Sequence, residues 1–206
     1  MYEYIIIIIL RWGALAIGVT IVMVTGIQQA YALEYEEQNH VTPWNIKEDV
    51  ISVLIMRDAS VPAHNLDVVE NMIETREKSD SMLFESWNDG IRKINSMYAS
   101  NIPILQMNNI HNQNYIIIYL KEENHPKYNG FTQLTYENNK IHSAFITIYN
   151  ADELPSIQIE RIVRHELGHA LGMSHISEQP SIMNSVIQNQ ASLISMFELK
   201  FLLTAY

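Results

Sequence analysis

The 206-residue chain contains no cysteine, so no disulfide bond can stabilise its fold. Zinc sites built on thiolate ligands are excluded for the same reason, and so is a latency mechanism in which a cysteine thiolate is a removable zinc ligand. The missing cysteines do not identify the compartment, because exported proteins can lack disulfides. Apolar residues make up 48% of the chain, which is enough to form one domain with a substantial core.

Basic residues are also scarce, with 13 Lys and Arg against 23 Asp and Glu, and the formal net charge is -10. Within residues 1–32 only Glu3 and Arg11 are charged, so the excess of acid belongs to the rest of the chain. This balance argues against non-specific binding to nucleic acid, which requires Lys and Arg to neutralise phosphates. Such acidity could attract calcium or cationic substrates, but it is also common in ordinary soluble domains.

Charge is almost absent from residues 5–27, a nearly continuous apolar run interrupted by Arg11. We interpret residues 1–32 as a signal peptide, because Ala30-Tyr31-Ala32 has small residues at the two positions that signal peptidase reads. The alternative is an N-terminal membrane anchor through residues 5–27, which would place Arg11 inside the bilayer, at a cost of about 2–3 kcal/mol at its centre. Both interpretations predict that the rest of the chain is secreted or otherwise extracytoplasmic.

The remainder is interpreted as a polar linker, residues 33–44, followed by one folded domain, residues 45–206. Runs rich in β-branched and aromatic residues predict strands at 50–56, 104–107, 115–120, 130–137 and 141–149, the last two joined by a turn at 138–140. Apolar residues at spacings of three and four predict helices at 66–76, 80–98, 156–171 and 192–204, with Ser156 as the N-cap of the third. This order of elements predicts an α+β, or mixed α/β, domain.

The most informative segment lies in the predicted helix 156–171 and contains His165, Glu166 and His169. Residues four apart project from nearly the same side of a helix, so the two imidazoles can bind one ion. Glu166 lies about 60° from His169 on the helical wheel, where its carboxylate can reach a water molecule at the metal without binding the metal itself. The opposite side of the helix is apolar and is expected to face the core: Ile159, Val163, Leu167, Ala170 and Leu171.

Gly172 and His175 complete the pattern. A glycine after a helix can adopt the left-handed conformation that turns the chain sharply, which would let His175 approach the ion from another direction. Three neutral imidazoles leave a fourth zinc position open, as in catalytic rather than structural zinc sites, and Glu166 would then be the general base. The alternatives are a structural metal site, which the adjacent acid counts against, and a coincidence, which the fixed spacing counts against.

The segment from His165 to His175 resembles the signature of the metzincin clan of zinc metallopeptidases, and within it the matrixin-like group. Ser181-Ile182-Met183-Asn184 is similar to that family's Met-turn, in which a methionine packs beneath the metal site. Gly130-Phe131-Thr132 resembles the start of the paired strands that precede the active-site helix. The resemblance implies a twisted, mostly parallel sheet with one antiparallel edge strand, a long active-site helix and a C-terminal helix.

The same resemblance implies one catalytic Zn²⁺, held by His165, His169 and His175, with Met183 in the Met-turn. It also implies a peptide or protein substrate bound as an extended strand along the edge strand, which we assign to residues 130–136. Calcium sites of the family are not assigned to residues here. Four further histidines lack the spacing of the second, structural zinc of animal matrixins: His64, His111, His125 and His142.

The leading hypothesis is therefore a zinc-dependent endopeptidase that cleaves exported or extracellular proteins, with Glu166 activating the water at the metal. A second hypothesis is a non-catalytic cell-surface binding module on the same fold, and the presence of Glu166 counts against it. A third is a metal-dependent hydrolase of a non-peptide bond, which His175 and Met183 count against. No nucleic-acid partner is expected, and contact with a membrane is expected only through residues 5–27 if they are not cleaved.

Overall fold

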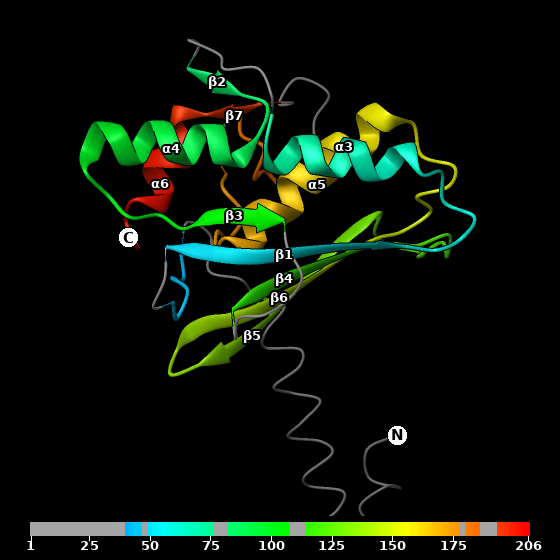
Figure 1. Cartoon of the computed structure of the whole chain (residues 1–206), viewed down its shortest axis with the longest axis horizontal. Coiled ribbons are helices and arrows are strands. Elements are labelled where there is room, and N and C mark those ends of the chain that lie inside the picture. Colours follow the sequence, from blue (N-terminus) through cyan, green and yellow to red (C-terminus); the bar gives the residue numbers. More distant parts are fainter. Residues whose placement is uncertain (1–39, 47–48, 76–81, 108–113, 178–179, 186–192) are drawn as a thin grey trace, which may run out of the picture. The chain divides into compact units, whose positions relative to one another are not determined.

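The computed structural model describes most of the predicted domain (Figure 1), namely residues 40–46, 49–75, 82–107, 114–177, 180–185 and 193–206. The predicted signal peptide or anchor, residues 1–32, lies outside the described residues, and so do residues 33–39 of the predicted linker. No helix within the described ranges is long and apolar enough to cross a membrane.

Five strands form one sheet in the order β3-β1-β4-β6-β5. Their bounds are Ile104–Met107 for β3, Val50–Arg57 for β1, Tyr115–Leu120 for β4, Lys140–Ile148 for β6 and Gly130–Glu137 for β5. The first four are parallel to one another, and β5 pairs antiparallel with β6 at the edge. The prediction of a mostly parallel sheet with one antiparallel edge strand is confirmed. Every second residue of the central strand β4 is fully buried: Ile116, Ile118 and Leu120.

The hairpin between β5 and β6 turns at Asn138 and Asn139, both with positive φ, 53° and 61°. Two consecutive left-handed residues make the turn that matches the twist of a two-residue hairpin, and asparagine tolerates this conformation well. The predicted turn is therefore confirmed, although Lys140 already belongs to β6 and pairs with Glu137.

Four helices lie together on one side of the five-stranded sheet (Figure 1). They are α3 (His64–Ile73), α4 (Trp87–Tyr98), α5 (Ser156–Ala170) and α6 (Met196–Leu202), and a two-stranded sheet of β2 (Leu83–Phe84) and β7 (Ile194–Ser195) lies near α4 and α6. The mixed α/β class and the long active-site helix with a C-terminal helix are as predicted.

Two predicted helices are shorter than expected. The helix predicted at 80–98 begins only at Trp87, because Leu83 and Phe84 pair with β7 and Ser86 caps α4 by accepting a hydrogen bond from Asp89 N. The helix predicted at 192–204 covers only α6, which begins after a capping box formed by Ser195 and Glu198. Tertiary pairing of the flanking residues overrides the helical periodicity in both cases.

Helix α5 differs from its prediction only at its ends. Pro155 occupies the N-cap position and no side chain caps the helix, so the expected capping role of Ser156 is wrong. The predicted apolar face is confirmed, because the side chains of Ile159, Val163, Leu167, Ala170 and Leu171 are all fully buried. A hydrogen bond also joins α5 to α4, because the indole N–H of Trp87 donates to the carbonyl of Arg164 at 2.9 Å. Helix α5 is thus fixed by its apolar side and by its neighbour α4.

Residues 40–46, named here the N-terminal strap, pack against the C-terminal end of α5. Val41 forms a β-bridge with Met173, and Trp44 forms one with Ile141. Trp44 is 2% exposed, and its indole N–H donates to the carbonyl of Ala170 at 2.8 Å. Residues 40–44, which the sequence assigned to a linker, therefore belong to the folded unit.

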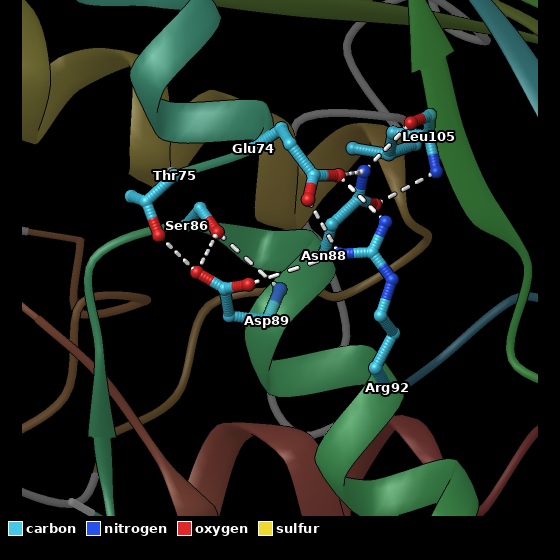
Figure 2. Close-up of polar contacts among 7 residues, drawn as sticks. All are labelled: Glu74, Thr75, Ser86, Asn88, Asp89, Arg92 and Leu105. Carbon is cyan, nitrogen blue, oxygen red and sulfur yellow. Dashed lines mark hydrogen bonds and ion pairs between the residues drawn. The ribbon is translucent and has the colours of Figure 1, made fainter. Parts of the chain in front are cut away.

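A group of hydrogen-bonded side chains, named here the α4 polar cluster, joins the end of α3 to the start of α4 and to β3 (Figure 2). Asn88 donates to Glu74 at 2.8 Å and to the carbonyl of Leu105 at 2.7 Å, and accepts from Leu105 N at 2.9 Å. The guanidinium of Arg92 donates to both carboxylate oxygens of Glu74 at 2.5 and 2.7 Å. The cluster is completed by Asp89, which accepts from Ser86 and Thr75.

Candidate metal centre

Three histidines, named here the histidine centre, converge although they come from two different segments. His165 and His169 lie one turn apart on α5, and His175 lies in the loop that follows it. One ring nitrogen from each lies within 4.8 Å of the others, a spacing at which all three could hold one metal ion. Within the described residues, no other group of three or more histidine or acidic side chains has its ligand atoms this close together. The structure thus brings together the three residues that the sequence predicted as ligands.

Backbone carbonyl groups select the tautomers of His165 and His169. Nδ1 of His165 lies 2.6 Å from the carbonyl oxygen of Ile182, and Nδ1 of His169 lies 2.8 Å from that of Met173. A carbonyl oxygen only accepts hydrogen bonds, so each Nδ1 must carry the proton and donate. Burial lowers the pKa of His165 to about 3 and that of His169 to about 4, so both rings are neutral at pH 7 and each Nε2 has a lone pair.

These two lone pairs face each other, which tests whether the centre fits a cation. Nε2 of His165 lies 3.1 Å from Nε2 of His169, and with both rings neutral and protonated at Nδ1 neither nitrogen can donate to the other. Two acceptors at this distance repel each other unless a positive ion lies between them. Tetrahedral zinc with Zn–N bonds of about 2.0–2.1 Å separates its nitrogen ligands by roughly 3.3 Å. The donor set therefore fits a zinc ion.

The turn at Gly172 is what carries the chain from α5 towards His175. Gly172 has φ +100°, a conformation that side-chain-bearing residues rarely adopt, as the sequence predicted. A Cβ at this position would lie 2.0 Å from the carbonyl oxygen of Thr42 in the N-terminal strap. A backbone hydrogen bond also joins the strap to the turn, since Thr42 N donates to the Gly172 carbonyl at 2.9 Å. Strap and turn are therefore packed too closely to admit another residue at position 172.

Met183 lies directly against the helix that bears two of the histidines. Its side chain is fully buried, and a Cβ at Gly168 would lie only 2.2 Å from its sulfur atom. Its carbonyl accepts from Ile176 N at 2.9 Å, just after His175. The segment 181–183 thus contacts both the helix and the loop of the histidine centre.

Glu166 is buried beside the histidine centre, with 6% of its surface exposed. Its Oε2 accepts a hydrogen bond from the hydroxyl of Thr132 on β5 at 2.6 Å. Gly130 lies against the same carboxylate, since a Cβ there would be 2.7 Å from Oε1. The edge strand β5 and the acid of helix α5 are therefore in direct contact.

Two further residues contact the centre in ways that the sequence analysis did not predict. Glu198 is 1% exposed, and its Oε1 accepts from Ile182 N at 3.1 Å, which ties α6 to the segment that binds His165. Thr132 contacts Glu166 across 34 residues of chain. The spacing of Ser195 and Glu198 is a capping-box signal that could have identified Glu198, whereas no local signal predicts the contact of Thr132 with Glu166.

Three histidines that the sequence set apart from the proposed ligands lie in the described part of the chain: His64, His125 and His142. His64, His125 and His142 contribute to no metal-binding cluster within the described residues, and His111 lies outside them. His125 instead stacks on Tyr128 with ring centroids 5.1 Å apart.

Comparison with family models gives a match to the matrixin model of peptidase family M10 over residues 67–199. This range covers more than half of the chain and includes α5, the histidine centre and Met183. A comparison with curated proteins gave no match. Matrixins are metallopeptidases with a catalytic zinc, and the three converging histidines could bind that metal. The chain belongs to the matrixin family.

Proposed function

We propose that this protein is a zinc-dependent endopeptidase that cleaves exported or extracellular proteins, with His165, His169 and His175 as zinc ligands and Glu166 as the general base. The observation that carries the proposal is the pair of facing Nε2 lone pairs, 3.1 Å apart, one residue away from a buried carboxylate. Such a pair needs a cation, and the acid beside it suits hydrolysis rather than a purely structural site.

A bound zinc ion would supply a Lewis acid that acidifies a water molecule and polarises a substrate carbonyl. The three imidazoles would hold it through one nitrogen each, with the carbonyl groups of Ile182 and Met173 fixing the rings of His165 and His169. Glu166 would accept the proton of the attacking water at its carboxylate and return it to the leaving amine. Met183 would support the centre from below by its contact with Gly168.

The substrate is proposed to bind as an extended strand beside β5. Within the described sheet β5 pairs only with β6, so its other edge offers backbone groups to a peptide. Phe131 and Tyr136 on this strand are 46% and 56% exposed. The edge lies next to Glu166 through Thr132, which would bring an added strand close to the proposed base.

Export of the protein is part of the proposal and rests on the apolar residues 5–27 and the Ala30-Tyr31-Ala32 sequence. A signal peptide would release the domain, and an uncleaved anchor would keep it at the outer face of a membrane.

The test compares the full wild-type chain with Glu166→Ala, using unfolded casein as substrate and measuring bound zinc in the same samples. We expect about one zinc per chain in both proteins. Cleavage should be sensitive to chelators in the wild type and at least about 100-fold slower in the variant, because the general base is missing. The matched control is Glu70→Ala on the exposed side of α3, which should cleave casein like the wild type.

The remaining outcomes separate the hypotheses. A wild-type protein that binds zinc but cleaves neither casein nor a diverse peptide library supports the binding-module alternative. A protein that binds no zinc contradicts the proposal as a whole. Full activity in Glu166→Ala would refute the assigned base while leaving the metal site in place.

A further inference from the structure

Two residues of strand β5, Gly130 and Thr132, lie directly against the side chain of Glu166. Residues 130 and 132 point to the same face of the strand, towards α5. The hydroxyl of Thr132 lies 2.6 Å from Oε2 of Glu166 and 3.1 Å from the backbone carbonyl oxygen of the same residue. Both are acceptors, so the hydroxyl is the donor, and the shorter contact is to the carboxylate.

Gly130 lies against the same carboxylate and against Ile162. A Cβ at position 130 would lie 2.4 Å from Cγ2 of Ile162, 2.7 Å from Oε1 of Glu166 and 2.9 Å from its Cγ. These distances are below any normal Cβ contact, so a larger residue at position 130 would displace the side chain of Ile162 or Glu166. One oxygen of the carboxylate is therefore bonded by Thr132, and the other lies against the backbone of Gly130.

A glutamate side chain has three rotatable bonds, and a general base must keep its oxygen in one place to be effective. We propose that Thr132 is a positioning residue for Glu166, which fixes the orientation of the carboxylate by donating its hydroxyl proton to Oε2. This inference rests on the proposed function, in which Glu166 is the general base. It adds that the strand proposed to bind the substrate also orients the base.

A merely structural role of Thr132 would give a different pattern of kinetic effects. Valine has almost the same shape as threonine but cannot donate a hydrogen bond, so Thr132→Val tests the hydroxyl alone. Binding of a peptide to the strand edge uses backbone groups, which the variant retains. Loss of positioning should therefore lower kcat and leave KM nearly unchanged.

The experiment measures kcat, KM, bound zinc and thermal stability for full-length variants, with a peptide that the wild type cleaves. We expect Thr132→Val to lower kcat about 10-fold, with KM within about twofold and one zinc bound, and Thr132→Ser to restore most of the rate. In a Glu166→Ala background, Thr132→Val should have no further effect on the residual rate. The matched control is Thr204→Val, which removes a hydroxyl bonded to the carbonyl of Phe201 at the end of α6 and should keep the wild-type kcat.

Should Thr132→Val fail to fold, the pair Thr132→Ser and Thr132→Ala carries the same test, since these two variants also differ by one hydroxyl. A wild-type kcat in Thr132→Val, or equal rates in the Ser and Ala variants, would overturn the positioning role and leave the proposed function intact. A further drop in rate when Thr132→Val is added to Glu166→Ala would also overturn it, because the hydroxyl would then act without the carboxylate. An inactive wild type would overturn both proposals together.

Discussion

The α4 polar cluster and the histidine centre each bring together polar side chains from more than one segment of the chain, but their hydrogen bonding differs. In the α4 polar cluster donors meet acceptors: Arg92 bonds both oxygens of Glu74, and Asn88 bonds the N–H and the carbonyl of Leu105 (Figure 2). In the histidine centre Nε2 of His165 faces Nε2 of His169, and neither is a donor. The donors and acceptors of the first cluster are paired within the chain, whereas the three histidines of the second could hold a metal ion.

This difference distinguishes a cluster whose hydrogen bonds are satisfied within the chain from a candidate metal site, without reference to any family. Polar groups near a core are stabilising when each finds its complement, and they cost free energy when like meets like. An arrangement of the second kind persists only if the surrounding structure holds it. Helix α5, with its fully buried apolar face, and the carbonyls of Ile182 and Met173 hold the imidazoles in place.

The largest expected effect comes from removing one imidazole. His169→Ala should weaken zinc binding by well over 100-fold, since changes in outer-shell partners alone typically cost 10- to 100-fold. Casein cleavage should be lost with the metal. Zinc content after dialysis and the cleavage rate are the two measurements. His142→Ala, a histidine of β6 near Glu137, is the matched control and should change neither. A His169→Ala protein that keeps one zinc and its activity would contradict the ligand assignment.

The second expected effect is a pH dependence of the zinc-free protein. The folded-state pKa values of His165 and His169 lie at about 3 and about 4, below the ordinary value of 6.5, because of burial. The unfolded chain therefore binds more protons below pH 6.5, so the contribution to stability is complete above pH 6.5 and is lost as pH falls towards 4 and 3. Between pH 7 and pH 5 the loss should be roughly 2 kcal/mol for each histidine.

The α4 polar cluster provides the contrast in the same experiment. Its hydrogen bond from Arg92 lowers the pKa of Glu74 below the ordinary 4.5, so its contribution is lost only at pH values below about 4.5. Denaturant unfolding with a chelator present, at pH 7 and pH 5, therefore isolates the histidines. His169→Ala should show about half of the wild-type change. An equal change in both proteins would show that the His169 imidazole is not a cause.

The histidine centre was predictable from the sequence because its information is local. The spacing of His165, Glu166 and His169 follows from the geometry of one helix, and Gly172 marks the turn before the third histidine. Runs of β-branched and aromatic residues also predicted the strands, including the buried β4. Convergence of the three side chains in the structure agrees with that pattern.

What the sequence could not give depends on contacts between distant segments. Thr132 reaches Glu166 from another element, and the strap residue Trp44 packs on the end of α5. Leu83 and Phe84 fit the helical periodicity of the residues after them, yet they pair with β7. A periodic pattern reports which side is buried and does not report which partner buries it.

The smallest expected effect tests whether the α4 polar cluster is purely structural. Asn88 is 1% exposed, and Asn88→Ala would leave the N–H and the carbonyl of Leu105 without the amide that bonds both. We expect a loss of about 2–3 kcal/mol in the free energy of unfolding, because buried groups that lose their partners cost about 1–3 kcal/mol.

Zinc binding and kcat should stay at wild-type values in the folded Asn88→Ala protein, since the cluster lies on the α3, α4 and β3 side and contributes no ligand. The matched control is Asn45→Ala, whose amide bonds only the exposed carboxylate of Glu137 at 3.0 Å among the described contacts and should cost less than about 0.5 kcal/mol. Denaturant unfolding gives the stability, and metal analysis gives the zinc. If Asn88→Ala loses zinc in step with stability, the two clusters are energetically coupled through Trp87 and the Arg164 carbonyl of α5, and the separation drawn between them would fail.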